Sequence, residues 1–248
     1  MHRRVSFGEL LMTQIVPAPM DPRGSLPQII LNIEELYEGT LIEYFQGFFL
    51  LANNTNLPYH NFRHCTHVLY LCHEGSRFYR DRLSKRRIRN VLVAALFHDY
   101  NHRGVGGDDA ENISLAISAL EELLLPIDRE AFDDIKILMR GTQYPYVFSS
   151  DTLPLEGLIL RDADLMQAFS PAWIQQVVFG LAAEWGKSPR DVLVMQQSFL
   201  GSIKFDTEWG RLEVPDAAIA LKINEAQALV DIIDMPGAAR LIREAQTV

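Results

Sequence analysis

The stretch that decides the fold is IRNVLVAALFHDYNHRG, residues 88–104. It begins as an apolar helical run, ends on the pair His98 and Asp99, and repeats a histidine four residues later at His102. A helix of this kind is expected to carry the pair into the interior, where a charged carboxylate needs a compensating partner. Imidazole and carboxylate side chains together suit zinc or a similar transition metal, and a carboxylate can also bridge to a harder ion such as magnesium. A metal centre at the end of a core helix explains these side chains, whereas the His-Asp pair alone could equally be a hydrogen-bonded helix end, so the surrounding motifs decide.

Apolar residues recur at helical spacing through most of the chain on either side of this stretch. Helical pattern runs from Gln28 onward and includes 65–83, 86–99, 109–125, 128–140, 155–168, 171–186, 189–204 and 216–233. Prolines and glycines fall between these segments, and alternating strand patterns are scarce. The sequence thus predicts an all-α fold of roughly nine or ten helices. We expect an irregular N-terminal arm over 1–27 and a single compact domain over 28–248.

Composition excludes several classes of protein. A net charge of -9 over 248 residues disfavours a broad basic surface for nucleic acid or anionic membrane. No apolar stretch reaches transmembrane length, and the first residues make a poor signal peptide. Two cysteines, Cys65 and Cys72, cannot form a disulfide framework and suit a reducing compartment, so a cytoplasmic protein is expected.

Histidines cluster in one part of the chain, because six of the seven lie between residues 60 and 102. His60, His64 and His67 are four and three residues apart, so they share a face if that segment is helical from its start. His67 could be an additional ligand, although a histidine on the helix surface or one supporting the ligands is the favoured reading. Cys65 and Cys72 could join a zinc site, but buried structural thiols are commoner.

Four motifs follow one another in an order that is typical of one family. They are YHNFRH at 59–64, LFHDYNHRG at 96–104, RDADLMQAF at 161–169 and MQQSF at 195–199. Together they resemble the catalytic domain of the class I cyclic-nucleotide phosphodiesterases, which are metal-dependent phosphohydrolases of the HD type. The similarity spans roughly residues 59 to 205, which makes accidental agreement at every motif improbable.

The resemblance implies a mechanism with two divalent metals. The ligands of the tighter ion, zinc or another transition metal, would be His64, His98, Asp99 and Asp164, and Asp99 would bridge to a magnesium or manganese ion. A hydroxide held between the ions would attack phosphorus while His60, as general acid, protonates the departing 3′ oxygen. His102 would support the water shell of the second ion, and Glu111 would orient His60 or a water.

The resemblance also implies a purine pocket, with Tyr59, Gln167, Gln196 and Phe199 as its substrate-binding residues. Gln196 would present its amide to the purine edge while Phe199 stacks on its face. An amide can exchange its donor and acceptor ends by flipping, so Gln196 alone does not choose cAMP over cGMP. The expected partner is a small cyclic nucleotide, with neither nucleic acid nor membrane, and a homodimer stays open.

Several positions depart from the family pattern. His67 replaces an acidic residue, Ile113 and Ser114 replace two histidines, and Gln167 stands where asparagine is frequent. Asp162 competes with Asp164 as a ligand, and Asp164 is preferred because it occupies the aspartate of the Ala-Asp-Leu motif.

Two alternative functions stay open. The chain could be an HD-type hydrolase of another nucleotide or phosphoester, or a nucleotide-binding regulatory protein with a weakened site. If Gln196 and Phe199 line the metal pocket, a cyclic purine nucleotide is favoured.

Overall fold

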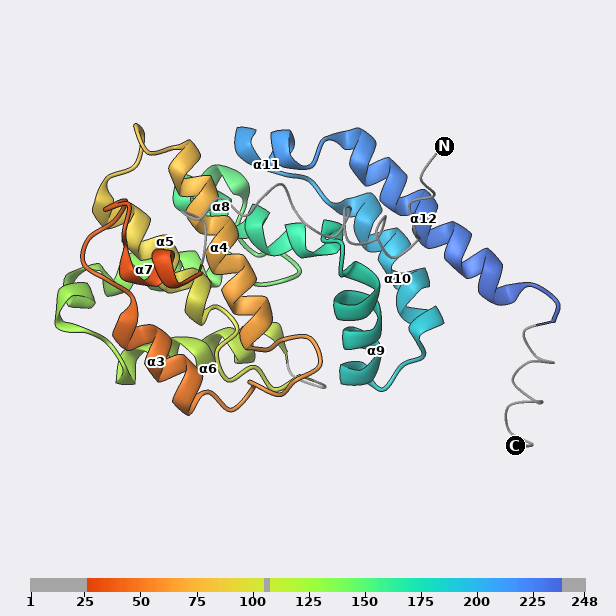
Figure 1. The fold of residues 1–248 in the computed structure, drawn as a ribbon, viewed down its shortest axis with the longest axis horizontal. Coiled ribbons are helices and arrows are strands. Elements are labelled where there is room, and N and C mark those ends of the chain that lie inside the picture. Colours follow the sequence, from red (N-terminus) through yellow and green to blue (C-terminus); the bar gives the residue numbers. More distant parts are fainter. Residues whose placement is uncertain (1–25, 105–107, 238–248) are drawn as a thin grey trace, which may run out of the picture.

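The protein is described by a computed structural model over residues 26–104 and 108–237, and the regular structure in these ranges is entirely helical (Figure 1). This confirms the all-α prediction. The described ranges contain eleven α-helices: α2 (Leu26–Leu31), α3 (Ile42–Leu51), α4 (Phe62–Phe78), α5 (Lys85–Phe97), α6 (Asp109–Glu122), α7 (Phe132–Arg140), α8 (Leu155–Leu165), α9 (Phe179–Trp185), α10 (Pro189–Ser202), α11 (Glu208–Glu213) and α12 (Asp216–Asp234). Shorter turns include the 3₁₀ helices η2 (Pro126–Ala131) and η4 (Met166–Phe169) and the π-helix η5 (Ile174–Val178).

The helix count exceeds the predicted nine or ten for two local reasons. The pattern that begins at Gln28 is interrupted between α2 and α3, where Asn32, Glu35 and Gly39 adopt positive φ angles that no helix accommodates. The short helix α11 carried no clear periodic signal, since it has only six residues. The predicted arm over 1–27 lies outside the described residues except for Leu26 and Pro27, which begin α2.

Helix α5 is the centre of the main core. All ten residues from Ile88 to Phe97 are buried, and α4, α7 and α8 pack around them. Its buried cation Arg89 forms a bidentate ion pair with Asp128, with Nε–Oδ1 and Nη2–Oδ2 distances of 2.7 Å. Asp128 also accepts a hydrogen bond from the Tyr44 hydroxyl at 2.9 Å. Because α5 is buried along its length, whatever follows Phe97 begins inside the fold.

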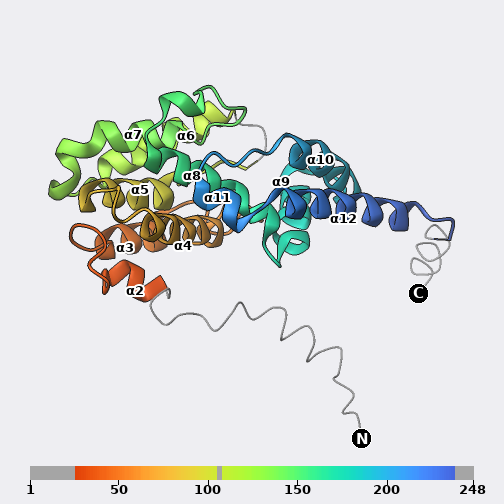
Figure 2. The same ribbon diagram turned by 90° about the horizontal axis from the view of Figure 1, so that it is seen from above.

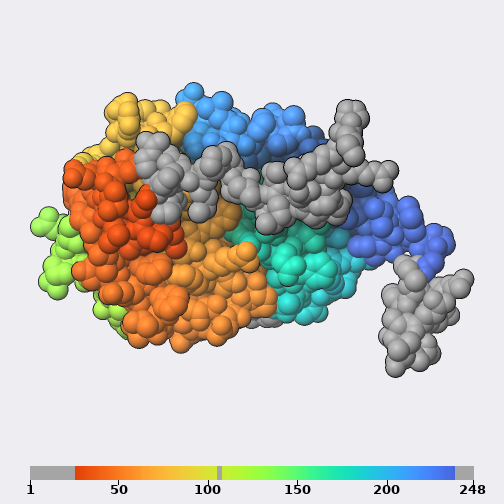
Figure 3. Space-filling model, viewed as in Figure 1, coloured from red at the N-terminus to blue at the C-terminus, as the bar shows by residue number. Residues whose placement is uncertain are grey.

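A second core lies between η5, α9, α10 and α12, at the end of the molecule away from α3 and α7 (Figures 1 and 2). It consists of Ala168, Trp173, Val177, Val178, Leu181, Ala182, Val192, Leu193, Leu200, Ala226 and Val230. Helix α12 extends past α10 in both views. On one face of the molecule the surface of the segment that leads into α4 adjoins that of α9, where the two parts of the fold meet (Figure 3).

Cys65 and Cys72 lie buried in α4 as free thiols. Of the helices in the described parts of the chain, none combines the length and the apolar character that crossing a membrane requires.

Candidate active site

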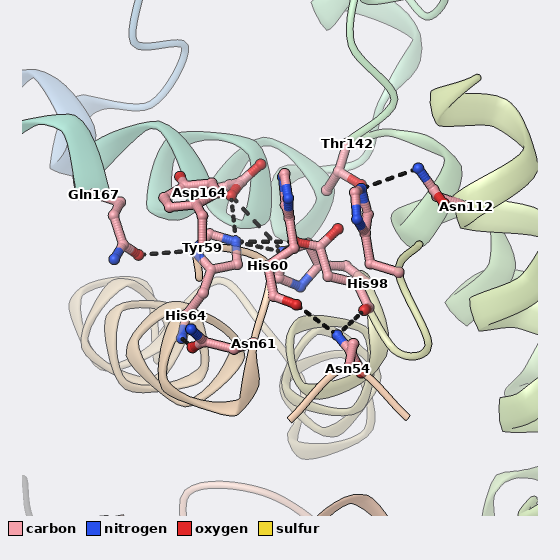
Figure 4. Close-up of polar contacts among 12 residues, drawn as sticks. Asn54, Tyr59, His60, Asn61, His64, His98, Asn112, Thr142, Asp164 and Gln167 are labelled. Carbon is pink, nitrogen blue, oxygen red and sulfur yellow. Dashed lines mark hydrogen bonds and ion pairs between the residues drawn. The ribbon is translucent and has the colours of Figure 1, made fainter. Parts of the chain in front are cut away.

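Four side chains from three elements converge at the inner end of α5. His64 lies on α4, His98 caps the C-terminus of α5 and precedes Asp99, and Asp164 lies near the end of α8. His64 Nε2 lies 3.1 Å from His98 Nε2 and from Asp99 Oδ2, and 3.2 Å from Asp164 Oδ1 (Figure 4). His98 Nε2 lies 3.3 Å from Asp99 Oδ2 and 3.7 Å from Asp164 Oδ1.

These separations fit the ligands of one divalent ion. Metal bonds of about 2.0–2.2 Å in tetrahedral or octahedral geometry place neighbouring ligand atoms roughly 3 to 3.6 Å apart. His64, His98 and Asp99 also offer ligand atoms that all lie within 4.8 Å of one another.

The outer nitrogen of each imidazole is already engaged, which turns the inner nitrogen toward the centre. His98 Nδ1 donates to the carbonyl oxygen of Ala95 at 2.8 Å, and His64 Nδ1 lies 2.8 Å from Gln167 Oε1, which can only accept. With its hydrogen on Nδ1, a neutral imidazole carries its lone pair on Nε2. Two such lone pairs facing each other at 3.1 Å repel unless a cation or a proton lies between them. The donor set therefore fits a metal.

The electrostatics of these side chains also favour a bound cation. Burial alone would lower the pKa of His64, but the hydrogen bonds and charges of Asp164 and Asp99 outweigh it and raise that pKa to about 9. Burial likewise opposes ionisation of Asp164, yet contact with His64 and His98 holds its pKa well below the usual range. The centre thus attracts positive charge, which a divalent ion would supply in place of protons.

His60 lies beside this centre and is held by a carboxylate from a distant helix. Its Nδ1 forms a short hydrogen bond to Glu184 Oε1, and Glu184 Oε2 accepts from the backbone N–H groups of Tyr59 at 2.9 Å and of His60 at 3.1 Å. Burial would raise the pKa of Glu184, but the hydrogen bond and charge of His60 outweigh it and lower that pKa, so the carboxylate stays ionised. An ionised partner on Nδ1 leaves Nε2 as the ring nitrogen available for proton transfer.

His60 does not share a helical face with His64 and His67. Helix α4 begins at Phe62, because the side chain of Asn61 caps it by accepting from the N–H groups of Arg63 and His64. His60 therefore lies in the preceding loop and reaches the centre from another direction.

The ring of His102 stacks on that of His60, with centroids 3.7 Å apart and an interplanar angle of 19°. Burial and the neighbouring His60 lower the pKa of His102 to about 4. Its Nε2 lies 3.0 Å from the amide nitrogen of Asn112, and its Nδ1 accepts from the N–H of Gly104 at 3.0 Å. His102 is therefore neutral near physiological pH and fixed in orientation.

The Asn54 side chain connects the loop that carries His60 to the loop that carries Asp99. Its amide nitrogen donates to the carbonyl oxygens of His60 at 2.7 Å and Asp99 at 2.8 Å, and its oxygen accepts from the N–H of Asn101 at 3.0 Å (Figure 4). Asn101 adopts a φ of 60°, which asparagine tolerates better than most residues. The relative position of His60 and Asp99 is thus fixed by one buried amide.

A cavity of about 610 Å³ opens beside the centre. His60 and Asp164 lie on its wall, and so do Tyr59, Gln196 and Phe199. The remaining lining residues are largely apolar or aromatic: Thr142, Tyr144, Tyr146, Leu165, Ala168, Val177, Leu181, Trp185, Val194, Met195, Ser198 and Ser202. Gln196 is buried on α10, and its Oε1 accepts from the indole N–H of Trp173 at 3.3 Å. The Phe199 ring contacts Tyr144 edge-on.

Two expected residues lie elsewhere, and the aspartate that competed with Asp164 has another role. Glu111 does not contact His60: its exposed carboxylate pairs with Arg103 at 3.1 Å. Gln167 is absent from the lining of the large cavity, because its side chain is turned to His64 Nδ1 on the other side of that ring. Asp162, the competitor of Asp164, accepts hydrogen bonds from Asp206 and Thr207 ahead of α11 and so supports that turn.

Two other histidines of this region are not among the side chains that converge at the centre. His73 is buried beside Glu74. His67 lies among His64 and Arg63, where burial lowers its pKa to about 4.

Glu184, Asn54 and Trp173 were not singled out from the sequence. One feature of the sequence could have drawn attention to Glu184, because it is a lone acid in the apolar segment FGLAAEW. Its pairing with His60, however, is a contact between residues 124 positions apart, which the sequence alone does not show.

Comparison with known proteins agrees with the motifs. The family model described as 3′5′-cyclic nucleotide phosphodiesterase matches residues 59–111, which include His60, His64, His98 and Asp99. The match is short and leaves Asp164 and Gln196 outside it. A search of curated proteins gave no match. Over residues 59–111 the chain is therefore similar to the cyclic nucleotide phosphodiesterase family, which confirms for this part the resemblance seen in its motifs.

Proposed function

We propose that the protein hydrolyses 3′,5′-cyclic nucleotides, cAMP or cGMP or both, to the 5′-monophosphates. One observation carries this proposal: a single cavity has His60 and Asp164 on its wall together with Gln196 and Phe199. The first pair belongs to phosphoester chemistry and the second to recognition of a flat base. Their presence around one space favours a purine nucleotide over an unrelated phosphoester or a mere binding role.

In this proposal His64, His98, Asp99 and Asp164 would hold the tight ion, zinc or another transition metal. Asp99 would also serve a second ion, magnesium or manganese. Divalent ions bound here would lower the pKa of a water and neutralise charge on the phosphoryl oxygens. The protein's own contribution is to hold both Nε2 atoms inward, through Ala95 and Gln167.

His60 is the proposed general acid. Glu184 fixes its ring through Nδ1, so that Nε2 points away from Glu184 and can donate to the 3′ oxygen as the P–O bond breaks. His102 is neutral, stacks on His60 and adds no positive charge beside the acid. Gly104 and Asn112 already engage both of its ring nitrogens, so its proposed role is to support the His60 ring rather than to hold a water of the second ion.

Gln196 is the proposed reader of the base. The indole N–H of Trp173 can only donate, so it assigns the facing amide atom of Gln196 as oxygen. The amide NH₂ is then free to donate to an acceptor on the purine, while the second lone pair of the oxygen can still accept. Phe199 offers a ring face or edge to the base.

A cytoplasmic location remains part of the proposal, and the two free thiols support it.

The test is turnover of cAMP and cGMP by purified protein with Mg²⁺ or Mn²⁺, followed by chromatography of the nucleotides. We expect 5′-monophosphate, a collapse of turnover in His60→Ala and Asp164→Ala, and near-normal turnover in the control His67→Ala. Loss of bound metal in Asp164→Ala but not in His60→Ala would separate the ligand from the acid. A wild-type protein that holds metal yet leaves both nucleotides intact would refute this substrate assignment.

A further inference from the structure

A second, smaller cavity adjoins the Nδ1 side of His64. Its volume is about 120 Å³, and its polar lining is Asn61, Arg63, His64, Gln167, Gln175 and Gln176, with no acid among the described side chains. A water molecule accounts for about 30 Å³ of liquid volume, so this space equals roughly four waters. A cation, amide groups and no carboxylate make the lining suited to an anion.

Gln176 lies between two groups that both donate hydrogen bonds. On one side its Oε1 accepts from Gln167 Nε2 at 2.7 Å. On the other side the three guanidinium nitrogens of Arg63 lie 2.9, 3.0 and 3.1 Å from its remaining amide atom. Guanidinium has no acceptor, so Arg63 requires oxygen there as well. A glutamine has one oxygen and cannot serve both sides.

Metal binding at His64 prevents the amides from resolving this conflict. If the Gln176 amide is reversed, its oxygen meets Arg63, but its NH₂ then faces the NH₂ of Gln167. Reversing Gln167 as well would turn its NH₂ toward His64 Nδ1. That nitrogen must carry hydrogen when Nε2 coordinates a metal. In the metal-bound protein the Gln176 NH₂ and the Arg63 guanidinium therefore face each other, with no acceptor from the described side chains between them.

We propose that this cavity is a binding site for a small oxyanion of the phosphate or sulfate class, and that its occupancy strengthens metal binding at His64. An oxyanion supplies several acceptors, so it can take hydrogen bonds from Arg63 and from the Gln176 NH₂ at once. Gln176 Oε1 then stays on Gln167, and Gln167 stays on His64 Nδ1–H. Linkage requires the converse, that bound metal strengthens binding of the anion. This inference rests on the proposed metal centre.

The test measures two affinities at constant ionic strength: that of sulfate, by its effect on the melting temperature, and that of Mn²⁺, by calorimetry with and without sulfate. Substitutions around a metal ligand commonly change metal affinity 10- to 100-fold. We therefore expect sulfate to tighten Mn²⁺ binding by about tenfold in the wild type. Arg63→Gln should lose this response, whereas Arg77→Gln, which removes the same charge from the same helix, should keep it. Gln176→Glu should bind Mn²⁺ tightly without sulfate, because a carboxylate accepts from both sides, and Gln175→Glu controls for the added charge.

An equal sulfate response in the wild type and Arg63→Gln overturns the proposal, and so does equal tightening by Gln176→Glu and Gln175→Glu. Failure of the metal centre itself would look different. The wild type would then take up no Mn²⁺, while stabilisation by sulfate that disappears only in Arg63→Gln would still identify the anion site. If sulfate stabilises none of the proteins, the site does not exist.

Discussion

Replacing Glu184 with glutamine isolates the part of the mechanism that depends on proton transfer. The carboxylate accepts three hydrogen bonds, one from His60 Nδ1 and two from the backbone N–H groups of Tyr59 and His60. Glutamine is similar in size but has one oxygen. If that oxygen stays on the two backbone groups, the new NH₂ faces His60 Nδ1 and opposes the protonated imidazole that acts as the acid.

The expected loss follows from the bond that is removed. A hydrogen bond to a charged group contributes about 1.5–3 kcal/mol, and about 1.4 kcal/mol corresponds to a tenfold change in rate. Glu184→Gln should therefore lower kcat/KM for cAMP or cGMP roughly 10- to 100-fold. Glu111→Gln is the matched control and should retain wild-type activity, since that exposed carboxylate pairs with Arg103 on the surface.

The assay compares a cyclic nucleotide with bis(4-nitrophenyl) phosphate. The nitrophenolate leaves as a stable anion and needs little help from an acid, so its hydrolysis should hardly change in Glu184→Gln. Metal content, measured on the same samples, should match the wild type. An equal fall for both substrates would refute the argument, because it would show that Glu184 supports the whole site rather than the proton donor.

Three further outcomes are expected. Asp128→Ala leaves the buried Arg89 without its partner and should lower the free energy of unfolding by about 3–5 kcal/mol in urea titrations. Burial would raise the pKa of Asp128, but Arg89 and the neighbouring donors outweigh it and hold that pKa below 3.8. The stability that the ionised Asp128 contributes is therefore present above about pH 4 and is lost as the pH falls through the folded pKa. Gly75→Ala should cost about 1–3 kcal/mol, since a Cβ there would lie 2.7 Å from Ile159 Cγ2, whereas Gly201→Ala, with open space around it, should cost nothing or stabilise α10 in the same titration. Chelation with EDTA should abolish turnover and lower the melting temperature, and Mn²⁺ should restore both; an unchanged melting temperature with full metal removal would contradict a structural contribution of the ion.

The sequence reveals the part of the site that is local and leaves out the part that depends on packing. His98 and Asp99 could be placed because a largely apolar helical run, 88–97, leads directly to them, and the apolar composition of that run indicated its burial. Glu111 was assigned to His60 or a water from the family resemblance alone, yet the helix that reaches His60 is α9, which carries Glu184. Gln167 was assigned to the substrate for the same reason, and its orientation toward His64 depends on Gln176 in the π-helix η5. A single sequence carries no direct record of such long-range contacts.

Helix α9 lies close to the loop before α4, and this explains how Glu184 from the second core can hold the proposed general acid, His60, beside the metal ligands of the first. The ligands His64, His98 and Asp164 belong to the part of the fold built around α5, whereas Glu184 belongs to the second core. Gly180 lies one turn before Glu184, on the same face of α9. A Cβ at that position would lie 3.0 Å from the Pro58 carbonyl oxygen and 3.3 Å from Tyr59 Cβ. Without a side chain at 180, α9 can approach the loop closely enough for Glu184 to reach both the backbone and the ring of His60. Gly180 allows the close packing and Glu184 makes the hydrogen bonds, so together they join the second core to the part of the fold that carries the proposed metal ligands.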